Sequence, residues 1–179
     1  MNIPSLTEYT LNTNLYRKVK SMNIKVRQLL TSVLGTIGIG ALSGLLSMGA
    51  MSDYAGFVKP PLAPPAWLFP IAWSILYLLM GISLYIVRTK EGVSDGDRQR
   101  AVVIYLWQLA VNFIWPLIFF NLGAYFAAFL WLLLLIVLVI LMIRRFYGIS
   151  KAAAWLNVPY LLWLLFAGYL NFAVWMLNR

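Results

Sequence analysis

The 179-residue chain contains no cysteine and no histidine. These absences exclude disulfide bonds, zinc sites of the cysteine–histidine type, cysteine nucleophiles, serine–histidine–aspartate triads and haem ligated by histidine or cysteine. Acidic residues are scarce, and the five in the chain are Glu8, Asp53, Glu91, Asp95 and Asp97. None of them falls inside an apolar run, which argues against a metal-dependent or acid–base hydrolase buried among those runs. We therefore expect no metal and no built-in cofactor.

Apolar residues are abundant, at 63% of the chain against 11% charged residues, and the mean hydropathy is +0.83. A soluble domain of this size cannot bury so much apolar surface, so lipid must surround most of it. Five apolar runs of about twenty residues each match the thickness of the hydrocarbon layer. The sequence thus predicts an all-α integral membrane protein, a five-transmembrane-helix bundle over residues 25–179 that follows a flexible cytoplasmic tail over residues 1–24. The expected spans are residues 29–51, 67–87, 101–120, 123–143 and 152–177.

The net charge of +9 is distributed as in membrane proteins rather than as in nucleic-acid-binding proteins. Twelve of the 14 basic residues lie before the first run or in the loops after the second and fourth runs. This asymmetry places the N-terminus in the cytoplasm and the C-terminus outside. The clean charge bias and the lack of a targeting signal favour a bacterial plasma membrane, and we expect no nucleic-acid partner.

A proline-rich stretch, residues 59–65, separates the first two apolar runs. Proline fixes φ and removes backbone donors, so this stretch cannot be helical and should form a stiff, extended connector. Trp73 and Tyr77 follow it four residues apart, on one face of the second span. We expect the connector to act as a lid over a chamber that contains these aromatic side chains.

The third run carries Gln108 and Asn112 four residues apart, and Pro116 should kink its helix. Amides are costly in hydrocarbon unless they are paired, so this face must look inward. The two amides could contact a ligand, or they could hold helices together. Gly40 and Gly44 in the first run allow a close helix–helix approach, either at a dimer seam or within one chain.

Several motifs in order resemble those of the TspO/MBR family of translocator proteins and tryptophan-rich sensory proteins. The likeness extends from Gly35 to Trp175 and so covers all five spans. The motifs are Lys59-Pro60 through Pro64-Pro65-Ala66-Trp67, Phe69-Pro70-x-x-Trp73, Leu76-Tyr77-x-x-Met80-Gly81, Gln108-x-x-x-Asn112-x-x-Trp115-x-x-x-Phe119-Phe120, and Pro159-Tyr160-x-x-Trp163-x-x-Phe166-Ala167 with Leu170-Asn171.

The resemblance implies a bundle that is usually a homodimer, with a ligand cavity under the loop between the first two helices. It implies tetrapyrrole ligands such as protoporphyrin IX or haem, together with benzodiazepine-type and other hydrophobic small molecules. Light-dependent porphyrin breakdown in some bacterial members is attributed to two tryptophans, which match Trp73 and Trp163. Tyr54, Asn112 and Ala167 match further pocket positions.

Two departures from the family pattern stand out. Leu62 occupies a loop position where the family commonly has tryptophan. Tyr169 is followed by no basic residue until Arg179, which argues against the sterol motif of mitochondrial members and hence against cholesterol.

The residues suit a flat, aromatic-walled slot with a few donors, as a porphyrin requires. Trp73 and Trp163 are the candidate walls, Gln108 and Asn112 the candidate donors, and Lys59 could meet a propionate. Tryptophan is also enriched at membrane interfaces without any ligand, although these two lie several residues inside their spans. We favour a tetrapyrrole-binding sensor or regulator. The alternatives are a light-dependent porphyrin-degrading enzyme, a small-molecule transporter, for which no intramembrane charge marks an ion path, and a scaffold.

Overall fold

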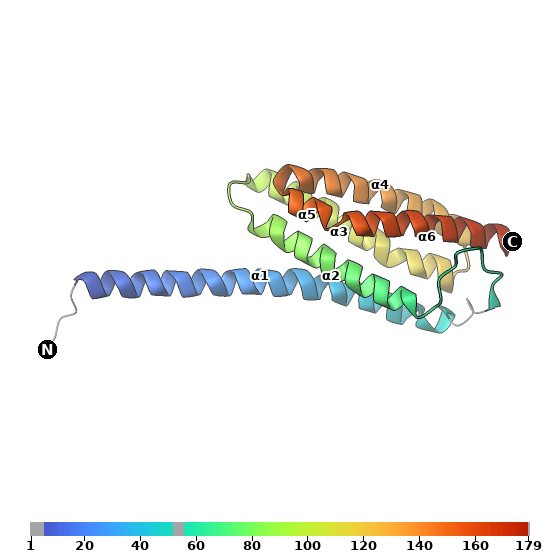
Figure 1. Cartoon of the computed structure of the whole chain (residues 1–179), viewed down its shortest axis with the longest axis horizontal. Helices are drawn as coiled ribbons and strands as arrows, with labels where there is room; N and C mark the ends of the chain where they lie inside the picture. Colours follow the sequence, from blue (N-terminus) through green and yellow to red (C-terminus); the bar gives the residue numbers. More distant parts are fainter. Residues whose placement is uncertain (1–5, 52–55, 179) are drawn as a thin grey trace.

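The computed structural model describes residues 6–51 and 56–178, and the side chains of residues 22–50 and 56–178. This part of the chain is helical and contains no strand. In Figure 1, helices α2 to α6 form a bundle, while α1 lies along one side and extends far beyond it toward the N-terminus. The elements are α1 (Leu6–Met51), α2 (Leu68–Thr89), α3 (Asp95–Pro116), the π-helical turn η2 (Leu117–Asn121), α4 (Tyr125–Ile149), α5 (Lys151–Trp155) and α6 (Val158–Leu177).

Five helical segments in the described ranges are long and apolar enough to cross a membrane. At 1.5 Å per residue, each covers the roughly 30 Å of a hydrocarbon layer. The prediction of an all-α bundle with five spans is therefore confirmed. The segments are Met22–Ala50, Leu68–Thr89, Asp95–Asn121, Tyr125–Ile149 and Lys151–Leu177.

The first helix includes most of the segment that was expected to be a flexible tail. It begins at Leu6 and continues without a break into the first span. The physical reason is local, because no proline or glycine occurs between residues 5 and 34 and nothing there interrupts the backbone hydrogen bonds. The domain boundary at residue 24 and the cytoplasmic location of this segment stay predictions.

The core lies between α2, α3, α4 and α6, where large side chains are fully buried. α1 joins this bundle mainly through small polar side chains. Thr36 Oγ1 and the Tyr105 hydroxyl are 2.6 Å apart, and Ser43 Oγ donates to the carbonyl oxygen of Phe113 at 2.7 Å. Because lipid gives little hydrophobic drive between helices, close packing and such hydrogen bonds hold α1 in place.

Glycine allows α1 and α2 to approach closely. A Cβ built on Gly81 would lie 2.7 Å from the Cα of Val33, and a Cβ on Gly40 would overlap the Tyr77 ring. Gly44, in contrast, is exposed and has no neighbouring atom within 4 Å of such a Cβ. Gly40 therefore packs within the chain, and a dimer seam through Gly44 stays a prediction.

Two prolines mark irregularities in the later spans. α3 ends at Pro116 and continues as η2, so the backbone changes pitch where a kink was expected. The fifth run was expected to be one helix, but it is split at residues 156–157 into α5 and α6, with Pro159 in the first turn of α6. Proline cannot donate a backbone hydrogen bond, which favours a break at this point, and the Asn157 side chain at the break donates to the carbonyl oxygen of Ala153 at 2.8 Å.

Candidate functional site

The described residues between α1 and α2, called loop 56–67 here, are tied to α6. The backbone N–H of Val58 donates to Asn178 Oδ1 at 2.9 Å, and Asn178 Nδ2 donates to the carbonyl oxygen of Val58 at 3.1 Å. The Tyr169 hydroxyl donates to the carbonyl oxygen of Pro61 at 2.8 Å. Figure 1 shows the loop beside the C-terminal end of α6. These contacts hold the loop against the end of the bundle.

The loop is not extended throughout. The N–H of Ala63 donates to the carbonyl oxygen of Pro60 at 3.2 Å, which closes a turn, and Leu62 within it has φ of 68°. A branched side chain in this left-handed region is strained, and the Leu62 side chain is 81% exposed. The prolines on either side have fixed φ angles, which reduces the number of shapes open to the turn.

We predict that Asn178→Ala loosens the loop. The substitution removes both hydrogen bonds to Val58, each contributing about 1 kcal/mol. Hydrogen–deuterium exchange at the Val58 amide should accelerate by at least about tenfold in detergent. Asn121→Ala serves as the matched control, because Asn121 donates to the carbonyl oxygen of Leu46 and does not touch the loop. Equal exchange in the two variants would contradict this role.

Aromatic rings, rather than close backbone contact, join α2 to α6 at the loop end of the bundle. The Trp73 ring stacks on Tyr77 with centroids 5.5 Å apart and meets Trp163 edge-on at 6.5 Å. Tyr160 also meets Trp73 edge-on, at 6.2 Å, and Phe69 meets Trp163 at 6.0 Å. The indoles of Trp73 and Trp163 are therefore in edge-on contact between α2 and α6.

The two amides of α3 are buried next to these rings. Asn112 Nδ2 donates to the Tyr77 hydroxyl at 3.1 Å, and the Tyr160 hydroxyl donates to Gln108 Oε1 at 3.1 Å. Through these bonds the structure brings together five predicted site residues, Trp73, Tyr77, Gln108, Asn112 and Trp163. With Tyr160 they form a group that we call the aromatic–amide cluster.

Two N–H donors of this cluster lack partners. Gln108 Nε2 and Trp163 Nε1 are buried and have no hydrogen-bond partner, and only two other buried side-chain atoms in the described residues share this condition. A buried, unsatisfied donor costs about 1–3 kcal/mol. In native proteins such a group commonly marks a functional position or a place for water or a ligand.

The remaining predicted residues lie outside the cluster. Lys59 is exposed in loop 56–67, and Ala167 is half-buried one helical turn beyond Trp163, packed against the core. Tyr54 falls outside the described residues. Sequence reasoning missed Tyr160 as a site residue, although its position three before Trp163 places both on one face of α6. It also missed Asn178, for which no local pattern gives a signal.

The chemistry on offer is that of apolar walls and neutral donors. No group of three or more histidine, cysteine, aspartate or glutamate side chains that could hold a metal ion occurs among the described residues. The cluster offers apolar ring surfaces and N–H donors, which is the usual composition of a small-molecule site.

The amino-acid sequence is similar to those of several known proteins. The chain is 40% identical over 156 residues to tryptophan-rich protein TspO of Archaeoglobus fulgidus, covering 87% of this chain and 99% of the relative. It is 38% identical to protein CrtK of Rhodobacter capsulatus, over 78% of this chain and 85% of the relative. The human translocator protein is 39% identical over 70% of this chain and 75% of its own length.

The match extends to a family-wide description. Residues 32–176, from the middle of α1 to the last turn of α6, fit the sequence pattern of the TspO/MBR family. This stretch includes every predicted site residue and the proline-rich loop. The chain therefore belongs to the TspO/MBR family, and it is an integral membrane protein with five spans.

Proposed function

We propose that this protein is a membrane sensor or regulator that binds tetrapyrroles, such as protoporphyrin IX or haem, at the aromatic–amide cluster under loop 56–67. Benzodiazepine-type ligands would occupy the same place. The observation that carries the proposal is the pair of buried, unpartnered donors, Gln108 Nε2 and Trp163 Nε1. A ligand with acceptor atoms would satisfy both groups and recover the free energy that an unpaired buried donor costs.

The composition of the cluster supports a porphyrin as the ligand. A tetrapyrrole is a broad apolar disc with carboxylates at one edge, and Trp73 and Trp163 supply aromatic surface for it from α2 and α6. Lys59 lies in the loop at the same end of the bundle, where a propionate would emerge. Asn178 and Tyr169 hold that loop in place, so ligand entry is coupled to these two contacts.

Titration with protoporphyrin IX in detergent, in the dark, tests the proposal. We expect saturable quenching of tryptophan fluorescence, with an affinity about tenfold lower for Trp163→Phe, which keeps an aromatic ring and loses the N–H donor. Trp155→Phe is the control, because that indole is 65% exposed on α5. Quenching that rises linearly with porphyrin concentration would contradict the proposed binding site. So would an affinity that the two variants lower equally.

The closeness of the two indoles favours a second candidate, light-dependent oxidation of porphyrin. Trp73 and Trp163 are 6.5 Å apart between ring centroids, and Tyr77 stacks on Trp73. An excited porphyrin can take one electron from such an indole, which gives a porphyrin radical anion and an indole radical cation. Dioxygen is then the oxidant for ring opening, and an electron returned from the oxidised porphyrin restores the indole. Repeating the titration under illumination separates the candidates. If bound porphyrin is lost no faster than free porphyrin, the enzyme hypothesis is wrong and the sensor hypothesis stands.

The orientation in the membrane, the compartment and the oligomeric state are proposals that rest on the charge distribution and on the family pattern. The basic loops flank one end of the bundle and loop 56–67 the other (Figure 1), so a cytoplasmic N-terminus puts the loop outside. We propose a bacterial plasma membrane and a homodimer as the setting.

A further inference from the structure

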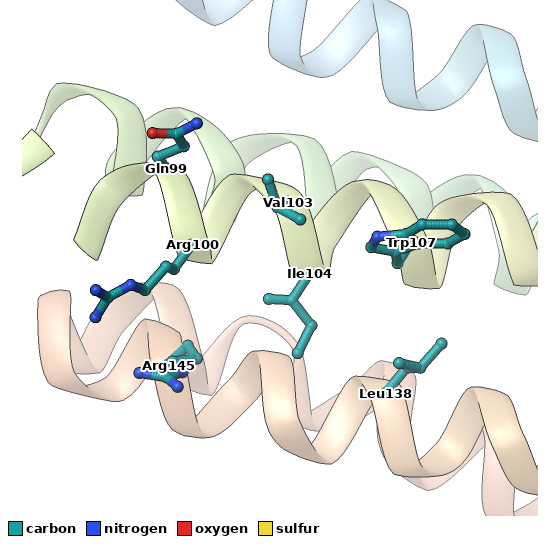
Figure 2. A pocket seen from close by; sticks show the side chains of 7 residues that line it. All are labelled: Gln99, Arg100, Val103, Ile104, Trp107, Leu138 and Arg145. Atoms are coloured by element: carbon teal, nitrogen blue, oxygen red, sulfur yellow. The ribbon is translucent and has the colours of Figure 1, made fainter. Parts of the chain in front are cut away.

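A groove lies between α3 and α4 (Figure 2), toward the start of α3 and the end of α4, which Figure 1 shows at the end of the bundle opposite loop 56–67. It holds about 410 Å³. It is separate from the aromatic–amide cluster, since the two have no residue in common. Its lining residues are Gln99, Arg100, Val103, Ile104, Trp107, Leu138 and Arg145.

One end of the groove is positively charged. Figure 2 shows Arg100 of α3 and Arg145 of α4 together at this end. Arg145 has no acidic partner among the described residues. Arg100 Nη1 is 3.7 Å from Asp97 Oδ1, a loose and exposed contact, and the other oxygen of Asp97 accepts from the Ser94 hydroxyl at the start of α3. This end of the groove thus has two guanidinium groups and one carboxylate, which only Arg100 contacts, and the excess charge is positive.

The other end is apolar and faces the surroundings of the bundle. Val103 and Trp107 continue the α3 stripe that starts at Arg100, and Leu138 faces them from α4. The Trp107 side chain is 64% exposed. Trp107 follows Arg100 by seven positions in the helix, or about 10 Å along the axis. The groove therefore runs from a cationic end near the helix termini to an apolar end inside the span.

This polarity matches one occupant. A free anion would use the arginines and leave the apolar half empty, whereas a neutral lipid would use the apolar half and leave the charges unmatched. We infer that the groove binds an anionic phospholipid, with its phosphate between Arg100 and Arg145 and an acyl chain along Trp107. Basic pockets between membrane helices recognise anionic headgroups through such charge-assisted hydrogen bonds.

Native mass spectrometry of the full chain in detergent tests this site, with phosphatidylglycerol and phosphatidylcholine offered in turn. We expect preferential retention of one phosphatidylglycerol, weakened about fivefold by Arg145→Gln and about as much again by adding Arg100→Gln. Arg144→Gln is the matched control, since the Arg144 side chain is exposed on the same helix, next to Arg145, and does not line the groove. Equal loss from Arg144→Gln and Arg145→Gln, or equal retention of the two lipids, would overturn the inference.

A second measurement locates the acyl chain and distinguishes a lipid from a simple anion. Phosphatidylglycerol with brominated chains should quench wild-type fluorescence more than that of Trp107→Phe, whereas brominated phosphatidylcholine should show a much smaller difference. Inorganic phosphate at the same concentration should not displace the retained lipid. Displacement by phosphate, or no difference in quenching at Trp107, would show that the groove is not a lipid site.

Discussion

Replacing Gly81 with alanine should lower the free energy of unfolding by about 3 kcal/mol. The added Cβ would lie 2.7 Å from the Cα of Val33 and 3.1 Å from the carbonyl oxygen of Ser32. Both are backbone atoms of α1 and cannot rotate away, so α1 must move off α2. That movement would also strain the hydrogen bond from Arg88 Nη1 to Ser32 Oγ, now 3.1 Å. Unfolding in mixed micelles with increasing dodecyl sulfate, followed by circular dichroism, measures the change.

Gly38→Ala is the matched control for this prediction. Gly38 lies in α1 as well, but nothing comes within 4 Å of a Cβ built on it. Since alanine favours a helix over glycine by about 1 kcal/mol, this variant should be neutral or slightly more stable than wild type. If Gly81→Ala proved as stable as Gly38→Ala, the close approach of α1 and α2 would be wrong.

Combining Asn112→Ala with Trp163→Ala should weaken protoporphyrin IX binding by about a hundredfold. The pair removes one wall of the cluster, one unpartnered donor, and the amide that fixes the Tyr77 hydroxyl. Each loss contributes about 1 kcal/mol, and the wall adds its buried area. Equilibrium titration of tryptophan quenching in the dark gives the affinity.

Asn121→Ala with Trp155→Ala repeats the same chemical change outside the cluster, on two exposed side chains. This variant should bind as wild type does. Helical content by circular dichroism checks that the cluster variant is folded, and Asn112→Leu offers a smaller perturbation if it is not. Affinity that is unchanged in a folded cluster variant would remove the proposed pocket.

The spans were predictable from the sequence because hydropathy is a property of each run by itself. α4 is the clearest case, a helix of 25 residues in which apolar side chains dominate. The irregular features were harder to predict, since each depends on a single residue whose effect opposes that of the run around it. Pro159 gives the signal for the break between α5 and α6, yet the surrounding apolar run outweighs it in any reading by hydropathy.

The cluster could be predicted in part for a similar reason. Trp73 with Tyr77, and Gln108 with Asn112, are each four residues apart, so each pair shares a helix face before any tertiary structure is known. The pairing of Tyr160 with Gln108, and of Asn178 with Val58, joins residues 52 and 120 positions apart. No local pattern specifies such contacts; the packing of the helices decides them.

The bond between Val58 and Asn178 also affects how the protein can be handled. Asn178 lies directly after α6 and makes two of the hydrogen bonds that hold loop 56–67. A tag or fluorescent protein inserted directly after this residue would pull on those bonds, so it would report on an altered loop. A fusion placed before α1, which extends away from the bundle, would leave those bonds untouched (Figure 1).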